Sequence, residues 1–521
     1  MINFPDEVRA VMAGKSVRLM KNRESWEFND LTVALHARNE TIAVEIQALG
    51  SSLASVTLFW KQSRNNAALI LNDHWERTCG DVSWHRNSET EHLPWYFMMH
   101  DGVQTTGTGV KTGACAFCSW QIGNEWLSLT MDTRSGGEGV QLGGRRLLAA
   151  EIVTIAGDPD ESPFQTGRRF MKTMCDRARM PAMPVYGIND WYFAYGNTSA
   201  ELILEHTRLM APMADGLSNR PFSVIDAGWF ETSPLVPEDT SWGSRLDVPN
   251  AKFGDMGKLA GQIREAGMRP GIWTRPLCAS HDDPFTLIVK GRDPKRPVID
   301  PTIPENRERI ADLFKVYNRW GYDLVKFDFT TFDLLGKWGS EMIREGAVTA
   351  PGWRLNDNSK TNAEIVLDVY RAIREAAGDT IIIACDTFAH LSAGIFELNR
   401  IGDDTSGIEW AKTRTMGVNT LAFRGMHHGI FYAADADCVG LTDKVPWEKN
   451  RQWMQLVAKS GTPLFVSAQP SATGPAQEVT IKECFALASQ ELPLGEPLDW
   501  MENAVPRKWR LMGKEERFEW E

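Results

Sequence analysis

The stretch Tyr322-Asp323-Leu324-Val325-Lys326-Phe327-Asp328-Phe329 is an apolar segment that ends in a lysine and an aspartate two residues apart. Side chains alternate between the two faces of a β-strand, so Lys326 and Asp328 are expected to point the same way. A cation beside a carboxylate keeps that carboxylate ionised at neutral pH, as a carboxylate nucleophile requires. The alternative is a structural ion pair at a strand end, and the rest of the chain must decide between the two.

Composition indicates a globular protein with a large core. The chain has 521 residues, of which 43% are hydrophobic and 24% are charged, which predicts two or three domains. A net charge of -12 argues against nucleic acid or an anionic membrane as the main partner. The first 21 residues, Met1 to Lys21, contain no continuous apolar run, so neither a signal peptide nor a membrane span is expected. We therefore expect a cytoplasmic protein.

Cysteine and histidine spacing gives no sign of a metal site. The eight cysteines are scattered and are expected to be reduced thiols. Cys115 and Cys118 form the only close pair, and they lack the second pair or the histidines of a zinc site. The ten histidines show no metal-binding motif. We expect neither a metal nor a cofactor.

Hydrophobic periodicity divides the chain into three parts. Residues 1–180 show alternating segments such as Ile42, Val44 and Ile46, which predict a β-sandwich-like domain. Two prolines in 181–184 mark a boundary. In 181–468 strands alternate with helical patterns, and 469–521 is predicted to be a short C-terminal β appendage.

The middle part is predicted to be a (β/α)8 barrel, an α/β fold also called a TIM barrel. Capping boxes at Thr198-x-x-Glu201 and Thr361-x-x-Glu364 predict the starts of two helices, and Pro304 predicts a third. Eight strand and helix units fit such a barrel. The predicted strands are 185–193, 222–225, 269–273, 322–329, 380–386, 400–404, 429–438 and 461–467.

Chemistry in such a barrel takes place at the C-terminal ends of the strands. The residues predicted there are Asp226, Trp229, Trp273, Arg275, Lys326, Asp328, Cys385, Asp386, Arg400, Asp403 and Asp404. Carboxylates dominate this set, and no phosphate-binding loop or Ser-His-Asp order is present. Two carboxyl groups acting on opposite sides of one bond are what glycoside hydrolysis requires.

The motifs Ile-Asp-Ala-Gly-Trp, Gly-Ile-Trp, Leu-Val-Lys-Phe-Asp, Ala-Cys-Asp and Arg-Ile-Gly-Asp-Asp follow one another in this order. As a set they resemble the α-galactosidase superfamily, glycoside hydrolase clan D, in particular family 36, which is related to family 27. The resemblance covers 181–468. The N-terminal part resembles the family's N-terminal domain only in being rich in β structure. It implies a retaining exo-acting α-glycosidase that acts on a small oligosaccharide or glycoside through a covalent intermediate.

The resemblance also implies roles for the catalytic pair. Its Lys-x-Asp motif makes Asp328 the nucleophile, with Lys326 binding sugar hydroxyls. Its Arg-x-x-x-Asp motif makes Arg400 a sugar-binding residue and Asp404 the acid/base, which we expect to be protonated in the resting protein. The alternation of side chains along a strand agrees with this assignment, because Arg400 and Asp404 then lie on one face of the predicted strand. Some members carry a Ser-Asp-Asn pattern that makes Asp403 the alternative acid/base.

Further substrate-binding residues follow from the same motifs. Asp386, after Cys385, falls where the family carries a residue near the sugar 2-position, and Cys385 is also expected to bind substrate. Trp229 and Trp273 resemble aromatic residues that line the pocket, and a barrel-core role is the alternative for Trp273. Asp435 and Asp437 resemble an acidic pair after the seventh strand, and we expect them to be structural.

One departure leaves the sugar open. Most family members have two aspartates where this chain has Asp226-Ala227, so one carboxylate that holds the galactose 4- and 6-hydroxyls is missing. A hydrogen bond to a charged group contributes about 1.5–3 kcal/mol, which is enough to change the preferred sugar. The aglycone, the linkage and homo-oligomer formation also stay open. A transglycosylase of the raffinose-synthase type and a catalytically idle sugar-binding protein are the alternative functions.

Overall fold

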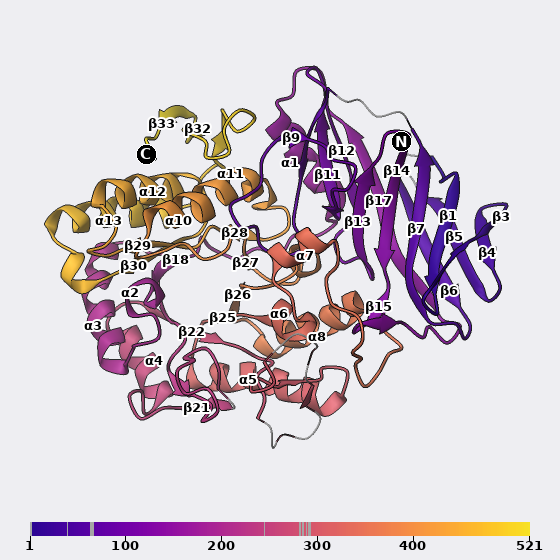
Figure 1. The fold of residues 1–521 in the computed structure, drawn as a ribbon. Helices are drawn as coiled ribbons and strands as arrows, with labels where there is room; N and C mark the ends of the chain where they lie inside the picture. Colours follow the sequence, from indigo (N-terminus) through magenta and orange to yellow (C-terminus); the bar gives the residue numbers. More distant parts are fainter. Residues whose placement is uncertain are drawn as a thin grey trace.

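The computed structural model describes residues 3–38, 40–62, 67–243, 245–280, 283, 286–287, 289 and 293–521. An N-terminal β-sandwich lies beside a barrel whose strands are surrounded by helices (Figure 1). This arrangement confirms the predicted α/β barrel with an N-terminal β-sandwich-like domain. Within the described ranges, every helix is too short or too polar to cross a membrane.

The sandwich consists of two antiparallel sheets whose inward side chains alternate with exposed ones. Helix α1 (Pro163–Met174) packs against strands of the larger sheet, and Ser162 caps its first turn. The smaller sheet has the order β10 (Leu93–Pro94), β13 (Phe117–Ile122), β14 (Trp126–Asp132), β7 (Leu53–Lys61), β1 (Glu7–Met12), β2 (Lys15–Arg18). The larger sheet has the order β3 (Met20–Asn22), β4 (Ser25–Phe28), β5 (Leu31–Arg38), β6 (Thr41–Ala48), β17 (Arg146–Ala156), β12 (Thr105–Val110), β11 (Tyr96–His100), β8 (Leu69–Asn72), β9 (His85–Arg86).

The barrel is one parallel sheet whose two edge strands follow each other directly in the chain. Its order is β28 (Ala433–Asp435), β27 (Leu398–Arg400), β26 (Ile381–Ala384), β25 (Leu324–Phe327), β22 (Arg269–Thr274), β19 (Phe222–Ile225), β18 (Tyr186–Asn189), β30 (Leu464–Ala468), β29 (Cys438–Leu441). Only Ala436 and Asp437 separate β28 from β29, and Asp437 has a φ of 71°. The predicted seventh strand is therefore two short strands, and its interruption closes the barrel.

Helices cover the outside of the barrel. Thr361 caps its helix with the predicted capping box, and Pro304 lies in the first turn of α5. The other cap differs, because Ser199 and not Thr198 accepts the hydrogen bond that starts α3. The main helices are α3 (Ala200–Met210), α4 (Met256–Glu265), α5 (Pro304–Trp320), α8 (Asn362–Ala377), α10 (Trp410–Thr413), α11 (Thr420–Arg424), α12 (Trp447–Lys459) and α13 (Pro475–Ala488).

Four predicted strands end earlier than the sequence suggests, those over 185–193, 322–329, 380–386 and 400–404. The first stops at Asn189, because α2 (Trp191–Ala194) begins directly after it. The sixth, predicted over 400–404, is β27, which ends at Arg400. Arg400 and Asp404 therefore do not share a strand face, and the alternation argument for them was wrong.

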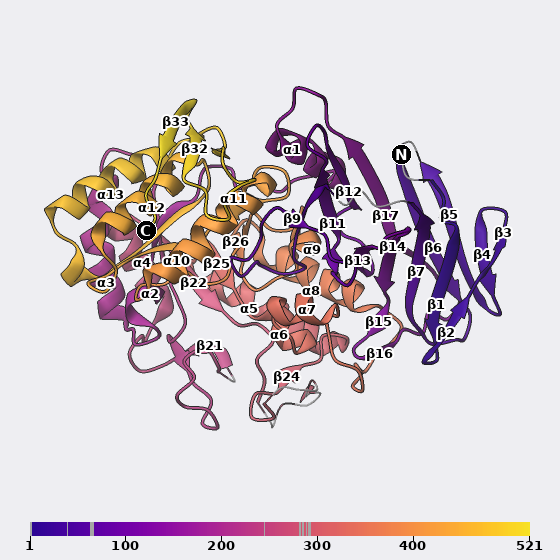
Figure 2. The ribbon, with the colours of Figure 1, turned by 45° about the horizontal axis from the view of Figure 1, so that its top comes forward.

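The last part of the chain contains both a helix and a small sheet. Helix α13 packs against α12 on the barrel and was not predicted. After it, β31 (Glu496–Pro497), β32 (Lys508–Leu511) and β33 (Lys514–Arg517) form a three-stranded antiparallel sheet, the predicted β appendage. Figure 2 shows β32 and β33 above α12 and α13.

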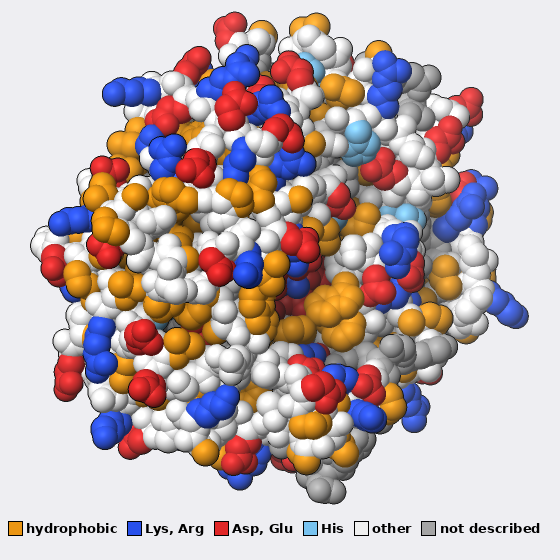
Figure 3. Space-filling view, turned by 60° about the vertical axis from the view of Figure 1, so that its left-hand side comes forward, with side chains coloured by type: hydrophobic (Ala, Val, Ile, Leu, Met, Phe, Trp, Pro, Cys, Tyr) orange, Lys and Arg blue, Asp and Glu red, His pale blue; other side chains and the backbone are white. Residues whose placement is uncertain are grey.

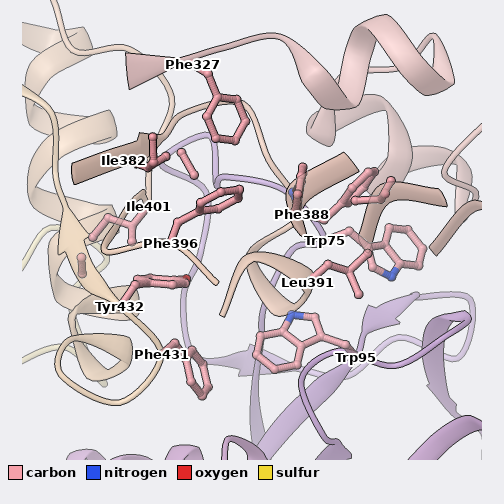
Figure 4. Close-up of a cluster of buried hydrophobic side chains, with 14 of the residues drawn as sticks. Trp75, Trp95, Phe327, Ile382, Phe388, Leu391, Phe396, Ile401, Phe431 and Tyr432 are labelled. Carbon is pink, nitrogen blue, oxygen red and sulfur yellow. Dashed lines mark hydrogen bonds between the residues drawn. The ribbon is translucent and has the colours of Figure 1, made fainter. Parts of the chain in front are cut away.

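One hydrophobic core runs across the boundary between sandwich and barrel. Trp75 and Trp95 from the sandwich lie among barrel residues that include Phe388, Leu391 and Phe431 (Figure 4). The Trp95 ring lies 5.8 Å from that of Phe431, and the rings of Phe117 and Phe388 are 4.5 Å apart. Aromatic contacts of this kind stabilise beyond the area they bury.

A buried ion pair joins the same two parts. Arg424 Nε donates to Asp73 Oδ1 at 2.5 Å, and both side chains are fully buried. Replacing Arg424 by methionine leaves Asp73 buried without its cation, so we expect the free energy of unfolding to fall by about 3–5 kcal/mol. Urea unfolding measures this loss. The double variant Asp73→Asn/Arg424→Met should recover part of it, and an unchanged midpoint in the single variant would contradict the pairing.

Candidate active site

Asp328 follows directly after strand β25, at the C-terminal end of the barrel. Phe329 next to it has a φ of 63°, which turns the chain sharply away from the strand direction. The Asp328 carboxylate accepts hydrogen bonds from the backbone N–H of Phe329 at 2.8 Å and of Asp386 at 3.3 Å. Trp273 Nε1 donates to its other oxygen at 3.3 Å. Three N–H groups thus fix a half-buried carboxylate in one orientation.

Lys326 pairs with Asp226 and not with Asp328, contrary to the expectation from their spacing. Lys326 Nζ lies 2.8 Å from Asp226 Oδ2, which also accepts from Asn189 Nδ2 at 2.7 Å. The reason is that Lys326 lies within β25, whereas Asp328 lies after its end. Burial lowers the pKa of the Lys326 ammonium, but the nearby negative charges, of which Asp226 contributes most, together hold that pKa well above its ordinary value.

The strand end at β19 is closed to solvent. Asp226 and Ala227 are both buried, and Ala227 N–H donates to Asp226 Oδ1 at 2.9 Å. Asp190, which the sequence analysis missed, accepts from Asp226 N–H at 2.8 Å. Burial and the neighbouring charge of Asp226 raise the pKa of Asp190 to about 6.

Cys385 and Asp386 follow strand β26 and are also buried. Asp386 is 0% exposed, and its Oδ1 accepts from Thr331 Oγ1 at 2.6 Å. The Cys385 sulfur lies 3.6 Å from one nitrogen of Arg400 and 3.6 Å from one of Arg77. Burial and the negative charge of Asp328 raise the pKa of the Cys385 thiol well above its ordinary value, so the thiol is uncharged.

Arg400 is buried at the end of β27 and joins two aspartates. Its Nη2 lies 3.0 Å from Asp437 Oδ2 and 3.2 Å from Asp404 Oδ1. Asp437 also accepts from the Thr405 N–H at 2.8 Å, so it holds the segment after β27 in place. This contact network, rather than strand alternation, brings Asp404 to Arg400.

Asp403 and Asp404 are both partly exposed, with side chains 32% and 36% exposed. Asp403 Oδ1 accepts from the N–H of Asp404 at 2.8 Å. Burial raises the pKa of Asp404, but the positive charges of Arg400, Arg77, Lys326 and Lys412 outweigh burial and lower that pKa to about 2. Asp404 is therefore ionised in the resting protein, which is the opposite of the expected protonated state.

The two predicted pocket tryptophans lie in the core. Trp229 is 0% exposed, its indole N–H donates to the Trp273 carbonyl at 2.9 Å, and its ring packs against Tyr317 and Trp320. Trp273 is also buried, with its ring stacked on that of Phe230. The pocket-lining role predicted for Trp229 is therefore wrong, whereas Trp273 reaches the site through its hydrogen bond to Asp328.

A loop from the sandwich reaches the same end of the barrel. Arg77 Nη2 lies 3.1 Å from Asp403 Oδ1, and Arg77 Nη1 lies 3.8 Å from Asp404 Oδ1. Sequence reasoning missed this residue because 326 positions separate it from Asp403, and no local pattern links them. The one available signal was an isolated charged and aromatic run, Asp73-His74-Trp75-Glu76-Arg77, that fits no strand alternation.

Partly exposed aromatic rings lie beside Asp328. Phe329 and Trp338 have ring centroids 5.7 Å apart, and Phe332 stacks on Trp338 at 4.2 Å. Arg275 does not enter the carboxylate cluster, because it pairs with buried Asp333 and lies over the Phe329 ring. One face of the molecule carries a recess with acidic side chains in its depth and hydrophobic side chains at its edge (Figure 3). Among the described residues, no group of three or more His, Cys, Asp or Glu side chains could hold a metal ion.

Comparison with known proteins places this geometry in a structural context. No protein-family model matches the chain. An α-galactosidase from Thermus thermophilus in complex with p-nitrophenyl α-D-galactopyranoside matches it with a TM-score of 0.62 and 17% identity, over 98% of this chain and 99% of that one. A family 36 α-galactosidase from Geobacillus stearothermophilus matches with a TM-score of 0.63 and 14% identity, over 96% and 78%. The chain therefore has the fold of the α-galactosidases of glycoside hydrolase family 36, as the order of its motifs predicts.

Proposed function

We propose that this protein is a retaining exo-acting α-glycosidase of the α-galactosidase type, which hydrolyses a terminal α-linked galactose or a related sugar. The observation that carries the proposal is the pair of partly exposed carboxylates, Asp328 after β25 and Asp404 after β27, at the C-terminal end of the barrel. The buried Lys326–Asp226 pair lies beside them. The similar structures support a small oligosaccharide as substrate, since the Thermus enzyme is also known in complex with stachyose.

In this proposal Asp328 attacks the anomeric carbon as the bond to the leaving oxygen breaks, which forms a covalent glycosyl-enzyme. Asp404 gives its proton to the leaving oxygen. Asp404 then takes a proton from water, whose oxygen attacks the anomeric carbon and releases Asp328. Lys326 is held for the sugar hydroxyls by Asp226, and Trp273 orients Asp328.

Asp404 is the preferred acid/base, with Asp403 as the alternative. Asp404 contacts Arg400, as the Arg-x-x-x-Asp motif implies, whereas Asp403 Oδ1 is engaged by the Asp404 N–H and by Arg77. The low pKa of Asp404 means that few molecules carry its proton at neutral pH. Substrates with a poor leaving group should therefore react faster as pH falls, for as long as Asp328 stays ionised and the fold survives.

Loss of the acid/base should show in the leaving-group dependence. In Asp404→Ala we expect kcat/KM for a natural disaccharide to fall by about two to four powers of ten, because no group protonates its leaving oxygen. An aryl glycoside with an acidic phenol should stay measurable. Asp403→Ala is the matched control, and it should lower kcat/KM for the disaccharide and for the aryl glycoside by a similar factor. The reverse pattern would assign the acid/base to Asp403.

A screen of aryl α- and β-glycosides, followed by NMR of the first-formed product, tests the function itself. We expect turnover of an α-galactoside or of a related α-glycoside with altered 2- or 6-substituents, with retention of the anomeric configuration. An inverted product would overturn the retaining mechanism. Binding of sugars with no turnover of any glycoside would favour the idle sugar-binding protein.

A further inference from the structure

The sandwich loop, residues 73–81, is attached to the barrel next to the proposed acid/base. Thr78 N–H donates to the Ile401 carbonyl at 3.1 Å, and Asp403 N–H donates to the Thr78 carbonyl at 2.8 Å. Arg424 Nη2 donates to the Glu76 carbonyl at 2.7 Å. The loop backbone is thus fixed against 401–403, the segment that carries Asp403 and precedes Asp404.

Glu76 within this loop lies against Asp386 of the barrel. Both side chains are buried, and their carboxyl groups lie within hydrogen-bonding reach of each other. Glu76 Oε2 and Asp386 Oδ2 are buried and receive no hydrogen bond from a donor group among the described residues. Two ionised carboxylates offer only acceptors, so this contact requires a proton between them. The pair therefore carries one proton and one negative charge.

The surroundings place that proton on Glu76. Burial and the negative charge of Asp386 raise the pKa of Glu76 well above its ordinary value, and burial also raises the pKa of Asp386. Arg77 favours ionisation of the pair, whereas Asp328 opposes it. The charged or titratable groups that face the pair are Arg77, Asp328, Tyr370 and Cys79.

Arg77 connects this protonated pair to the acid/base. Its Nε lies 3.4 Å from Glu76 Oε1, and its far end reaches Cys385, Asp403 and Asp404. A guanidinium held at both ends has one available orientation, since its nitrogen atoms are fixed in a plane. Moving Glu76 would therefore move the positive charge that faces Asp404.

We propose that Glu76 and Arg77 are positioning residues of the barrel's active site, in which a proton shared by Glu76 and Asp386 holds Arg77 against Asp403 and Asp404. The proposal deepens the glycosidase function and rests on it for the role of Asp404. Under this proposal the sandwich loop, residues 73–81, helps to set how tightly Asp404 of the barrel binds its proton.

Infrared spectroscopy tests the shared proton without any substrate. At about pH 8, Asp190 and Asp435, whose pKa values burial raises to about 6, are ionised, so they do not contribute. We expect the carbonyl stretch of a protonated carboxylic acid in the wild-type protein and its loss in Glu76→Gln. A wild-type spectrum without this band would overturn the proposal, whatever the protein's activity.

The pH profile of kcat/KM for a substrate with a poor leaving group tests Arg77. The descending part of the alkaline limb is measured between about pH 6 and pH 8, above the expected acid transition. Removing the charge of Arg77 in Arg77→Met should raise the pKa of Asp404 and displace this limb toward higher pH by about one pH unit or more, because an opposite charge at this distance shifts a carboxyl pKa by roughly that amount. At a fixed pH in that range kcat/KM should then rise about tenfold or more. Arg77→Lys keeps the charge and should shift the limb less. Glu76→Gln, which can still donate to Asp386, should resemble the wild type, and Glu76→Ala should resemble Arg77→Met.

A structural role alone would change stability without moving the limb, so thermal unfolding is measured on each variant. Coinciding profiles for the wild type and Arg77→Met would overturn the positioning role. Absence of turnover in the wild type would contradict the proposed function, and the infrared band would still decide the Glu76–Asp386 proton.

Discussion

Replacing Asp328 by asparagine is expected to lower kcat/KM by roughly four powers of ten while the protein stays folded. Asparagine removes the attacking carboxylate oxygen, so no glycosyl-enzyme can form. Its remaining side-chain oxygen can still accept from the N–H groups of Phe329 and Asp386, which both bond the same Asp328 oxygen, and only the 3.3 Å bond from Trp273 Nε1 to the other oxygen is lost. The local structure should therefore survive, and the thermal unfolding midpoint reports it.

Azide provides the positive test of the same assignment. In Asp328→Ala, which removes the whole carboxyl group, a small anion that fits the vacated space attacks the anomeric carbon directly, so rescue should yield a glycosyl azide of inverted configuration. Asp323→Asn is a matched control, because Asp323 precedes the same strand at its far end and pairs with Arg264. We expect this control to keep its activity. A rate within tenfold of the wild type in Asp328→Asn would show that another group is the nucleophile.

Acid is expected to unfold the protein near pH 5 because four histidines, three buried and one half-buried, have lowered pKa values. Burial lowers the pKa of His206, His390 and His427 to about 3 and that of His428 to about 4, and for His427 the nearby Asp73 only partly offsets it. In the unfolded chain a histidine has a pKa of about 6.5. The unfolded state therefore binds more protons below that pH, and stability falls as pH falls toward the folded pKa values.

The size of the effect follows from this difference in proton binding. At about pH 5 each histidine favours the unfolded state by about 2 kcal/mol, so the four together contribute on the order of 8 kcal/mol. Asp190 and Asp435, whose raised pKa values favour the folded state as pH falls, offset roughly 2–3 kcal/mol of this. Folded proteins have a total stability of about 5–15 kcal/mol. Far-UV circular dichroism between about pH 7 and pH 4 should show a cooperative transition.

A single histidine can be removed to test the cause. Both ring nitrogens of His390 lack hydrogen-bond partners among the described residues, and its ring stacks on Trp95. His390→Phe should keep the packing, remove one titrating group and move the acid midpoint downward. His36→Phe alters a half-exposed surface histidine and should leave the midpoint in place. Full stability at pH 4 in the wild type would contradict the whole argument.

Local patterns were sufficient for much of the barrel. The predicted strand 222–225 coincides with β19, and Thr361 and Pro304 begin their helices as expected, because periodicity and capping act within a few residues. The break at Asp437 had no such signature, since its φ depends on the contacts that close the barrel. The predicted site residues lie close together at the strand ends, apart from Trp229 and Arg275.

Contacts between segments that are distant in the chain could not be predicted from the sequence. Lys326 and Asp328 are neighbours in the chain, yet Lys326 binds Asp226 from another strand. Arg77 meets Asp404 only because the sandwich packs on the barrel, and its charge adds to that of Arg400 in lowering the pKa of Asp404. A single sequence carries no record of which loop will cover a strand end.

The core shared by sandwich and barrel limits how this architecture can be rearranged. A truncated protein limited to the barrel would expose Phe388 and Phe431 to water, and it would leave Arg424 without Asp73. It would also lose Arg77 from the catalytic end. The sandwich is therefore not an exchangeable module, and domain-swapped chimeras need to carry both halves from the same parent.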